Sequence, residues 1–192
     1  MAAKTESTFI NMVVVLTVVT ALAGLALGSV YNLTKEPIEI AKQAKLNKAI
    51  EAVLPAFDKI QEMKVQEANG SDSLKFYIAT KDSVVIGTAV ETYTMKGFSG
   101  LVKLMVGFLP DGSIQNISVL EHKETPGLGT KMSTPKFKDQ FMGIQPASFN
   151  LKVKKDKGDV DAITAATISS RAFCDAVQRA YDTFEKNKGG NE

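Results

Sequence analysis

The most constraining feature of the sequence is a stretch without charge near its N-terminus. No charged residue occurs between Glu6 and Lys35, and within that gap Phe9 to Leu33 comprises 25 residues, of which 18 are apolar. As a helix this segment would be about 37 Å long, at roughly 1.5 Å per residue. The hydrocarbon core of a bilayer is about 30 Å thick. The segment is therefore predicted to cross a membrane once, with some tilt.

The alternative for such a segment is a cleaved signal peptide, whose apolar region usually has about 7–15 residues. The apolar run is longer than that, which favours an uncleaved anchor. Its orientation follows less clearly from charge. Lys4 precedes the run, whereas Lys35, Lys42, Lys45 and Lys48 follow it. A literal count of lysines therefore places the C-terminal part of the chain in the cytoplasm.

The rest of the chain has the composition of an ordinary globular domain. Because 23 Lys and Arg stand against 21 Asp and Glu, the net charge is +2, and the basic surface typical of a nucleic-acid-binding domain is absent. One Cys excludes an internal disulfide and a multi-cysteine zinc or iron–sulfur site. One His argues against a His-rich metal site. We expect neither a metal site nor a nucleic-acid partner.

Hydrophobic periodicity in this part predicts both strands and helices. Runs rich in β-forming residues predict strands over Leu74–Thr80, Ser83–Thr94, Leu101–Leu109 and Ile114–Leu120. The last two are joined by a link with Asp111-Gly112, which is typical of a hairpin turn. The sequence therefore predicts an antiparallel sheet of about four strands.

Helices are predicted before and after this sheet. A juxtamembrane helix is expected over residues 34–55, with Thr34 as its N-cap. A short helix is expected over Ser133–Met142, and an apolar stripe predicts a final helix over Ser170–Lys186 that includes Cys174 as a buried thiol. The run Lys152–Lys157 is expected to be a solvated loop or strand edge.

These elements predict an α+β fold, in which helices flank an antiparallel sheet that one N-terminal transmembrane helix precedes. The expected organisation has four parts along the chain. They are a short tail over residues 1–8, a transmembrane anchor over 9–33, the juxtamembrane helix over 34–55 and a globular domain over 56–192.

Two loops of the globular domain can carry chemistry. The first, residues 121–131, contains Pro126, Gly127 and Gly129, so its backbone can approach a flat ligand closely. A simple connection between two elements is the alternative for this loop, and His122 within it has no partner for catalysis that spacing identifies.

The second loop, residues 159–171, is dense in hydroxyl and small side chains and runs into the final helix. Ser169 or Ser170 is a suitable N-cap for that helix. A phosphate at this point would meet free backbone N–H groups and the positive end of the helix dipole. Composition alone does not distinguish such a phosphate site from a plain capping segment.

The segment Asp161-Ala-Ile-Thr-Ala-Ala-Thr-Ile-Ser-Ser170 resembles a known flavinylation motif. It is the motif of the FMN-binding domain that the G subunit of the Rnf complex shares with the C subunit of the sodium-pumping NADH:quinone reductase. The motif usually reads Ser/Thr-Gly-Ala-Thr, and its last Thr, here Thr167, carries FMN through a phosphoester bond. Glu124-Thr-Pro-Gly-Leu-Gly129 resembles the second signature of this family, and the N-terminal span also agrees with it. The short chain is more similar to the Rnf G subunit.

The resemblance implies that FMN, bound covalently to Thr167, is the cofactor, and that the chain has no catalytic residue of its own. It implies further flavin contacts at Glu124, Thr125, Gly127, Leu128, Gly129, Lys131, Thr164, Ala166, Ile168 and Ser169. It also implies that a flavin transferase, which moves FMN from FAD, recognises Asp161, Thr164, Ala165 and Ala166. Lys131 is expected to favour a reduced anionic flavin.

One departure from the family motif concerns Ala165, which stands where the family usually has Gly. If this position requires a positive φ, an alanine costs roughly 1 kcal/mol or more there. Such a cost would slow flavinylation more readily than abolish it.

By resemblance, the chain is an electron-transfer subunit of an Rnf-type complex in the cytoplasmic (inner) membrane, which couples ferredoxin–NAD electron transfer to Na⁺ or H⁺ translocation. The expected partners are the other subunits of the complex, the flavin transferase and membrane lipid. The family places the flavin domain on the extracytoplasmic side, against the lysine count. Two alternatives remain open at this point. One is a flavin subunit of the quinone-reductase type or a stand-alone anchored flavoprotein, and the other is a non-redox scaffold subunit whose motif has lapsed through Ala165.

Overall fold

The computed structural model describes residues 8–68, 70 and 72–188. The chain forms two compact units, Met1–Ala44 and Lys45–Glu192. Helix α1 (Phe9–Val53) begins in the first unit, and it is long and apolar enough to cross a bilayer, as predicted. Its apolar side chains within the first unit are exposed, which is the state that a lipid-facing helix requires.

The predicted helix start at Thr34 is wrong, because α1 continues through this residue without a break. The Thr34 hydroxyl donates to the carbonyl oxygen of Val30 at 2.8 Å, one turn earlier, instead of capping a new helix. Pro37 lies inside the helix and not in a first turn. The anchor and the juxtamembrane segment are thus one continuous helix.

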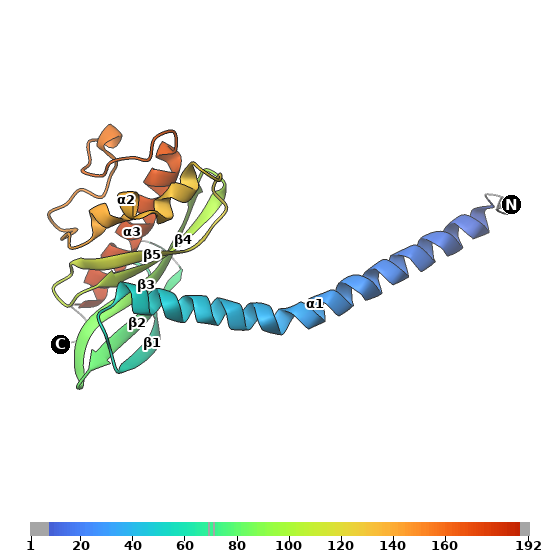
Figure 1. Cartoon of the computed structure of the whole chain (residues 1–192), viewed down its shortest axis with the longest axis horizontal. Helices are drawn as coiled ribbons and strands as arrows, with labels where there is room; N and C mark the ends of the chain where they lie inside the picture. The colour runs from blue at the N-terminus through green and yellow to red at the C-terminus, as the bar shows by residue number, and fades with distance from the viewer. Residues whose placement is uncertain (1–7, 69, 71, 189–192) are drawn as a thin grey trace. The chain divides into compact units, whose positions relative to one another are not determined.

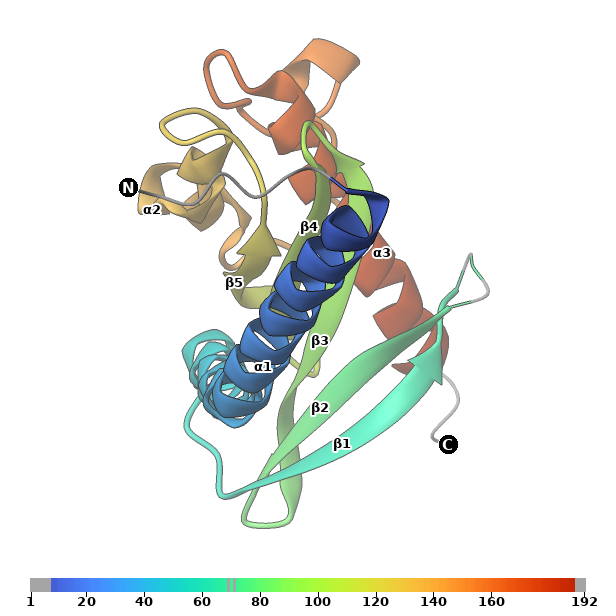
Figure 2. The same cartoon turned by 90° about the vertical axis from the view of Figure 1, so that its right-hand side faces the viewer.

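The second unit is built on a five-stranded antiparallel sheet, whose spatial order follows the sequence from β1 to β5 (Figures 1 and 2). The strands are β1 (Lys59–Gln66), β2 (Ser73–Lys81), β3 (Val84–Gly97), β4 (Gly100–Phe108) and β5 (Ile114–His122). Four of them match predicted strands. Strand β1 was missed because seven of its eight residues are exposed, so that it lacks the usual alternation of buried side chains.

Helix α3 (Thr167–Lys188) covers one face of the sheet. In Figure 2 this helix lies behind β3 and β4. Between them lies the main core, in which Phe108, Phe141 and Phe173 are fully buried. The last turns of α1, from Lys45 onward, pack on the opposite face. The α+β prediction, with helices flanking an antiparallel sheet, is confirmed.

Short helical turns connect the sheet to α3. They are the 3₁₀ turn η1 (Gly129–Ser133), helix α2 (Pro135–Lys138), and the 3₁₀ turns η2 (Asp139–Phe141) and η3 (Lys154–Asp156). The helix predicted over Ser133–Met142 is therefore a four-residue α-helix flanked by 3₁₀ turns. The lysines of the Lys152–Lys157 run are exposed, as expected for a solvated loop.

Candidate functional site

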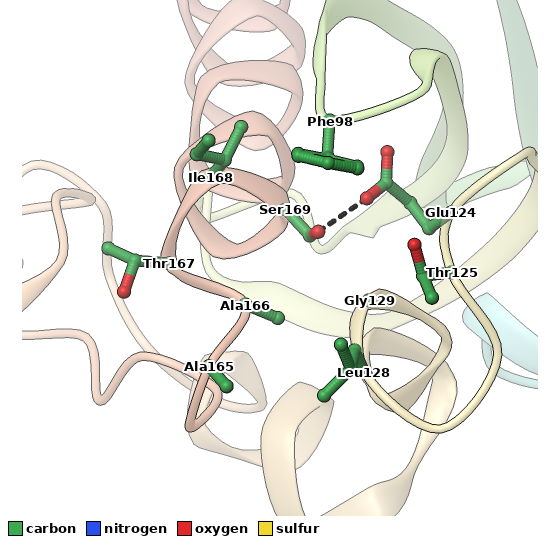
Figure 3. Close-up of a pocket in the computed structure, with 10 residues that line it drawn as sticks. All are labelled: Phe98, Glu124, Thr125, Leu128, Gly129, Ala165, Ala166, Thr167, Ile168 and Ser169. Carbon is green, nitrogen blue, oxygen red and sulfur yellow. Dashed lines mark hydrogen bonds between the residues drawn. The ribbon is translucent and has the colours of Figure 1, made fainter.

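The loop after β5 and the loop before α3 meet at one cavity of about 370 Å³ (Figure 3). Its lining residues are Phe98, Glu124, Thr125, Leu128, Gly129, Ala165, Ala166, Thr167, Ile168 and Ser169. All except Phe98 belong to the two motifs singled out in the sequence. The fold therefore brings together two segments that are about 40 residues apart in the chain.

A buried carboxylate joins these segments. Ser169 Oγ donates a hydrogen bond to Glu124 Oε2 at 2.5 Å, and the backbone N–H of Ser99 donates to Glu124 Oε1 at 3.0 Å. Glu124 is only 4% exposed and Ser169 only 2%. The Glu124 side chain thus links the β5 loop, the β3–β4 turn and the first turn of α3.

Gly129 allows this close approach. A Cβ atom at this position would lie 2.6 Å from Ser169 Oγ and 2.7 Å from Glu124 Oε2, closer than real Cβ contacts. The second glycine of the Glu124–Gly129 motif is therefore required by packing against the hydrogen-bonded pair, whereas Gly127 has a positive φ of 75° in the turn itself.

Phe98 is the site residue that sequence reasoning missed. It lies in the β3–β4 turn, is 68% exposed, and projects between Ile168 and the Glu124 carboxylate in Figure 3. The signal in the sequence that could have identified it is an aromatic residue within the turn Gly97-Phe98-Ser99-Gly100. Binding residues are found disproportionately on loops that a rigid scaffold holds in place.

The start of α3 differs from the prediction. The helix begins at Thr167, so Ser169 and Ser170 lie in its first turn and neither is the N-cap. Ser170 Oγ accepts from the backbone N–H of Ile163 at 2.9 Å and donates to the carbonyl oxygen of Ala166 at 3.0 Å. It holds the preceding loop against the helix instead of capping it.

Ala165 adopts a left-handed conformation with φ of 61°. This backbone region favours glycine and costs an alanine about 1–2 kcal/mol. The position at which the family motif usually has Gly therefore has a positive φ in this protein, and Ala165 is strained there.

Four predicted site residues do not line the cavity. They are Gly127, Lys131, Asp161 and Thr164, all exposed. Asp161 forms an ion pair with Lys154 at 2.8 Å, and its backbone N–H donates to Gln140 Oε1 at 2.8 Å. The motif aspartate therefore holds the loop in place from outside the cavity.

Thr167 lies at the edge of the cavity, and its hydroxyl points away from Glu124 and Thr125 in Figure 3. On that side, Lys155 Nζ donates to Thr167 Oγ1 at 3.4 Å. Arg171, one turn into α3, forms a bidentate ion pair with Asp156 through two contacts of 2.7 Å. This hydrogen-bonded guanidinium holds the pKa of the Asp156 carboxyl below its usual range.

The surroundings of His122 and Cys174 indicate structural and not catalytic roles. His122 Nδ1 accepts from the backbone N–H of Glu124 at 3.3 Å, within the same loop. Cys174 belongs to α3 and is buried, as predicted, and burial raises the pKa of its thiol to about 12. No cluster of His, Cys, Asp and Glu side chains that could hold a metal ion occurs among the described residues.

Comparison with known proteins places these features in a family. The FMN-binding domain family matches residues 97–182, a range that contains every residue lining the cavity. The G subunit of the ion-translocating oxidoreductase complex of Methanosarcina acetivorans is 32% identical over 93% of this chain and 96% of its own. The chain belongs to this G-subunit family. Two further G subunits are similar to this chain. That of Vibrio atlanticus is 33% identical over 82% of this chain and 81% of its own length. That of Aliivibrio fischeri is 34% identical over 86% of this chain and 87% of its own length.

The fold of this protein is similar to that of a solved structure. The C subunit of the Na(+)-translocating NADH-quinone reductase of Parabacteroides distasonis matches with a TM-score of 0.55 and 16% identity, over 78% of this chain and 85% of its own. At that identity the likeness concerns the fold alone. The resemblance stated from the two motifs is confirmed, and the relatives' name favours the G subunit over the quinone-reductase type.

Proposed function

We propose that this protein carries FMN covalently on Thr167 and transfers electrons within an Rnf-type membrane complex. The observation that supports this proposal best is the meeting of the two motifs at one cavity, with Thr167 at its edge. The protein needs no substrate pocket of its own, because its role is to pass electrons between neighbouring redox centres.

The residues of the cavity suit FMN. Its volume of about 370 Å³ lies within the usual range for small-molecule sites, roughly 300–1,000 Å³. Phe98, Leu128 and Ile168 offer exposed apolar surface for a flat ring system, while Thr125 adds a polar group at the lining. When bound, FMN supplies the redox chemistry of the protein.

Attachment requires a transfer reaction at the Thr167 hydroxyl. A bond forms between Thr167 Oγ1 and the phosphorus of the FMN half of FAD, the bond to the bridging oxygen of the pyrophosphate breaks, AMP leaves, and the hydroxyl proton is released. No electron changes hands in this step. Thr167 is the first residue of α3, where N–H groups without a helical partner and the helix dipole favour a phosphate.

The flavin transferase must reach this threonine from outside. Asp161, Thr164 and Ala165 are exposed on the loop before α3, which suits recognition by an enzyme. We propose that they form the transferase-binding segment together with Ala166. Gly127 and Lys131, which do not line the cavity, are proposed to contact the parts of the flavin that extend beyond it.

The complex as a whole is proposed to couple ferredoxin–NAD electron transfer to Na⁺ or H⁺ translocation, with the other Rnf subunits and membrane lipid as partners. We place the flavin domain on the extracytoplasmic side of the cytoplasmic membrane, as the family resemblance implies. The lysines after the apolar run lie in the continuous helix α1. This helix can fold before its lysines influence membrane insertion, so the lysine count is a weak guide to orientation.

The decisive experiment is covalent flavin detection. The full chain is co-expressed with a flavin transferase, denatured and examined by in-gel flavin fluorescence. Fluorescence is expected for the wild type and for Thr167→Ser, which keeps a hydroxyl, and none for Thr167→Ala. A dark wild-type band would support the scaffold alternative, and a fluorescent Thr167→Ala band would mean that another residue is modified.

Orientation has its own test. Because Cys174 is buried, a cysteine introduced at the exposed Lys64 of β1 supplies a unique reactive thiol. A membrane-impermeant maleimide is expected to label Lys64→Cys in intact spheroplasts as fully as in lysed ones. Labelling only after lysis would place the domain in the cytoplasm.

A further inference from the structure

Two of the charged side chains near Thr167 form ion pairs with carboxylates, and Lys155, which contacts the Thr167 hydroxyl, does not within the described part of the chain. Asp156 is engaged by Arg171, and Asp161 is engaged by Lys154. Lys155 forms no ion pair with any carboxylate of the described residues, and its ammonium group contacts the Thr167 hydroxyl. A lysine without a carboxylate partner in this part of the chain therefore lies beside the hydroxyl to which FMN is proposed to be attached.

We propose that Lys155 is the charge partner of the phosphate group on Thr167, before and after flavin transfer. This inference rests on the proposed attachment of FMN to Thr167. A phosphodiester carries one negative charge at neutral pH, and a lysine ammonium presents three donors to its oxygens. Charge-assisted hydrogen bonds of this kind are stronger than neutral ones.

The loop that carries Lys155 is held in place by its neighbours. Lys155 lies in η3, whose flanking residues Val153 and Val160 are buried and form a bridge. The Arg171 guanidinium ties Asp156 to α3 through two hydrogen bonds. This pairing has a second effect, because it neutralises the carboxylate nearest in sequence to Lys155, which would otherwise repel the phosphate.

Lys155 is thus a positioning residue for the transfer reaction, in which it stabilises the phosphate as Thr167 Oγ1 bonds to phosphorus. Replacing its charge is expected to slow flavin incorporation about 1.5- to 5-fold, the range for one exposed charge contact. Since the contact is exposed to solvent, the defect is expected to shrink as ionic strength rises.

The test compares Lys155→Gln with Lys157→Gln in the full chain, co-expressed with a flavin transferase. Lys157 is a matched control: it is exposed in the same loop, and its side chain has no contact with Thr167 among the described residues. Lys155→Arg keeps the charge and is expected to restore most of the rate. The initial rate of covalent flavin incorporation is measured by in-gel fluorescence at low and high salt.

A second readout is thermal stability. Each variant is purified with flavin and, from cells without transferase, without it. Attachment of flavin is expected to raise the Tm of Lys155→Gln about 2 °C less than it raises that of the wild type or Lys157→Gln. This difference reports a contact with the attached group, which a general effect on folding would not produce.

The outcomes are distinct. A wild type that never acquires flavin contradicts the proposed function itself, and the Lys155 inference with it. A labelled wild type in which Lys155→Gln and Lys157→Gln behave alike, in both rate and Tm difference, overturns the role of Lys155 alone. A defect confined to Lys155→Gln and relieved in Lys155→Arg supports it.

Discussion

Ser169 Oγ donates to Glu124 Oε2 across 2.5 Å, and this contact joins the two motifs through residues that are 45 positions apart in the sequence. The carboxylate also accepts from the Ser99 N–H. It forms no ion pair among the described residues although it is buried, so hydrogen bonds alone compensate its loss of water. The pair is therefore a structural link between the two loops that line the cavity.

Ser169→Ala is expected to lower the free energy of unfolding by about 1.5–3 kcal/mol, because it removes a donor from a buried carboxylate. Urea denaturation of the full chain in detergent measures the change. Ser133→Ala, at an exposed serine, is the control and should stay within about 0.5 kcal/mol of the wild type. Equal stability of the two variants would show that the Glu124 contact contributes nothing.

Ala165→Gly is expected to stabilise the protein by about 0.5–1 kcal/mol, because relief of the left-handed strain exceeds the added flexibility of the unfolded chain. Ala162→Gly, in the same loop but without a positive φ, should destabilise it by about 0.4–1 kcal/mol. Opposite signs in urea denaturation support the strain, and a loss of stability in both variants contradicts it. Flavin incorporation should be faster in Ala165→Gly.

Phe98→Ala is expected to change the cofactor environment and not the fold. The ring is largely exposed, so the free energy of unfolding should change by less than about 0.5 kcal/mol. Iodide should quench the fluorescence of the attached flavin more strongly, since one wall of the cavity is lost. Met95→Ala, an equally exposed residue of the same hairpin that does not line the cavity, should match the wild type. Identical quenching in both variants would place the flavin elsewhere.

Cys174 makes stability fall at high pH. Burial raises the pKa of its thiol to about 12 in the native state, against about 8.5 in an unfolded chain. The native state therefore binds the proton more tightly. The contribution of the thiol is fully present below the unfolded pKa and is lost as pH rises towards the native pKa, by at most about 1.4 kcal/mol per pH unit.

The measurement for this prediction is the free energy of unfolding of the wild type and of Cys174→Ala at several pH values above about pH 8, where the unfolded thiol begins to ionise. The wild-type curve should fall more steeply, whatever constant offset the lost side chain causes. Tyr77, whose pKa is also raised by burial, acts equally in both proteins. Parallel curves would mean that the native thiol ionises as readily as the unfolded one.

Much of the fold could be predicted because its signals are local. The charge-free run before Lys35 and the apolar stripe of the last helix each lie within one element, so periodicity identifies them. Strand β1 escaped because it is an exposed edge strand, with only Val65 buried. The start at Thr34 was predicted wrongly because a threonine hydroxyl bonds equally well to a carbonyl one turn earlier.

By itself, the sequence determined the anchor, the α+β class and the two motifs, since these depend on the order of residues along the chain. Only the tertiary structure decided which motif residues share a cavity, that Phe98 joins them, that Ala165 has a positive φ and that Lys155 faces Thr167. The reason is physical. Such relationships are set by packing and charge pairing between segments distant in sequence, and no local pattern encodes where those segments meet.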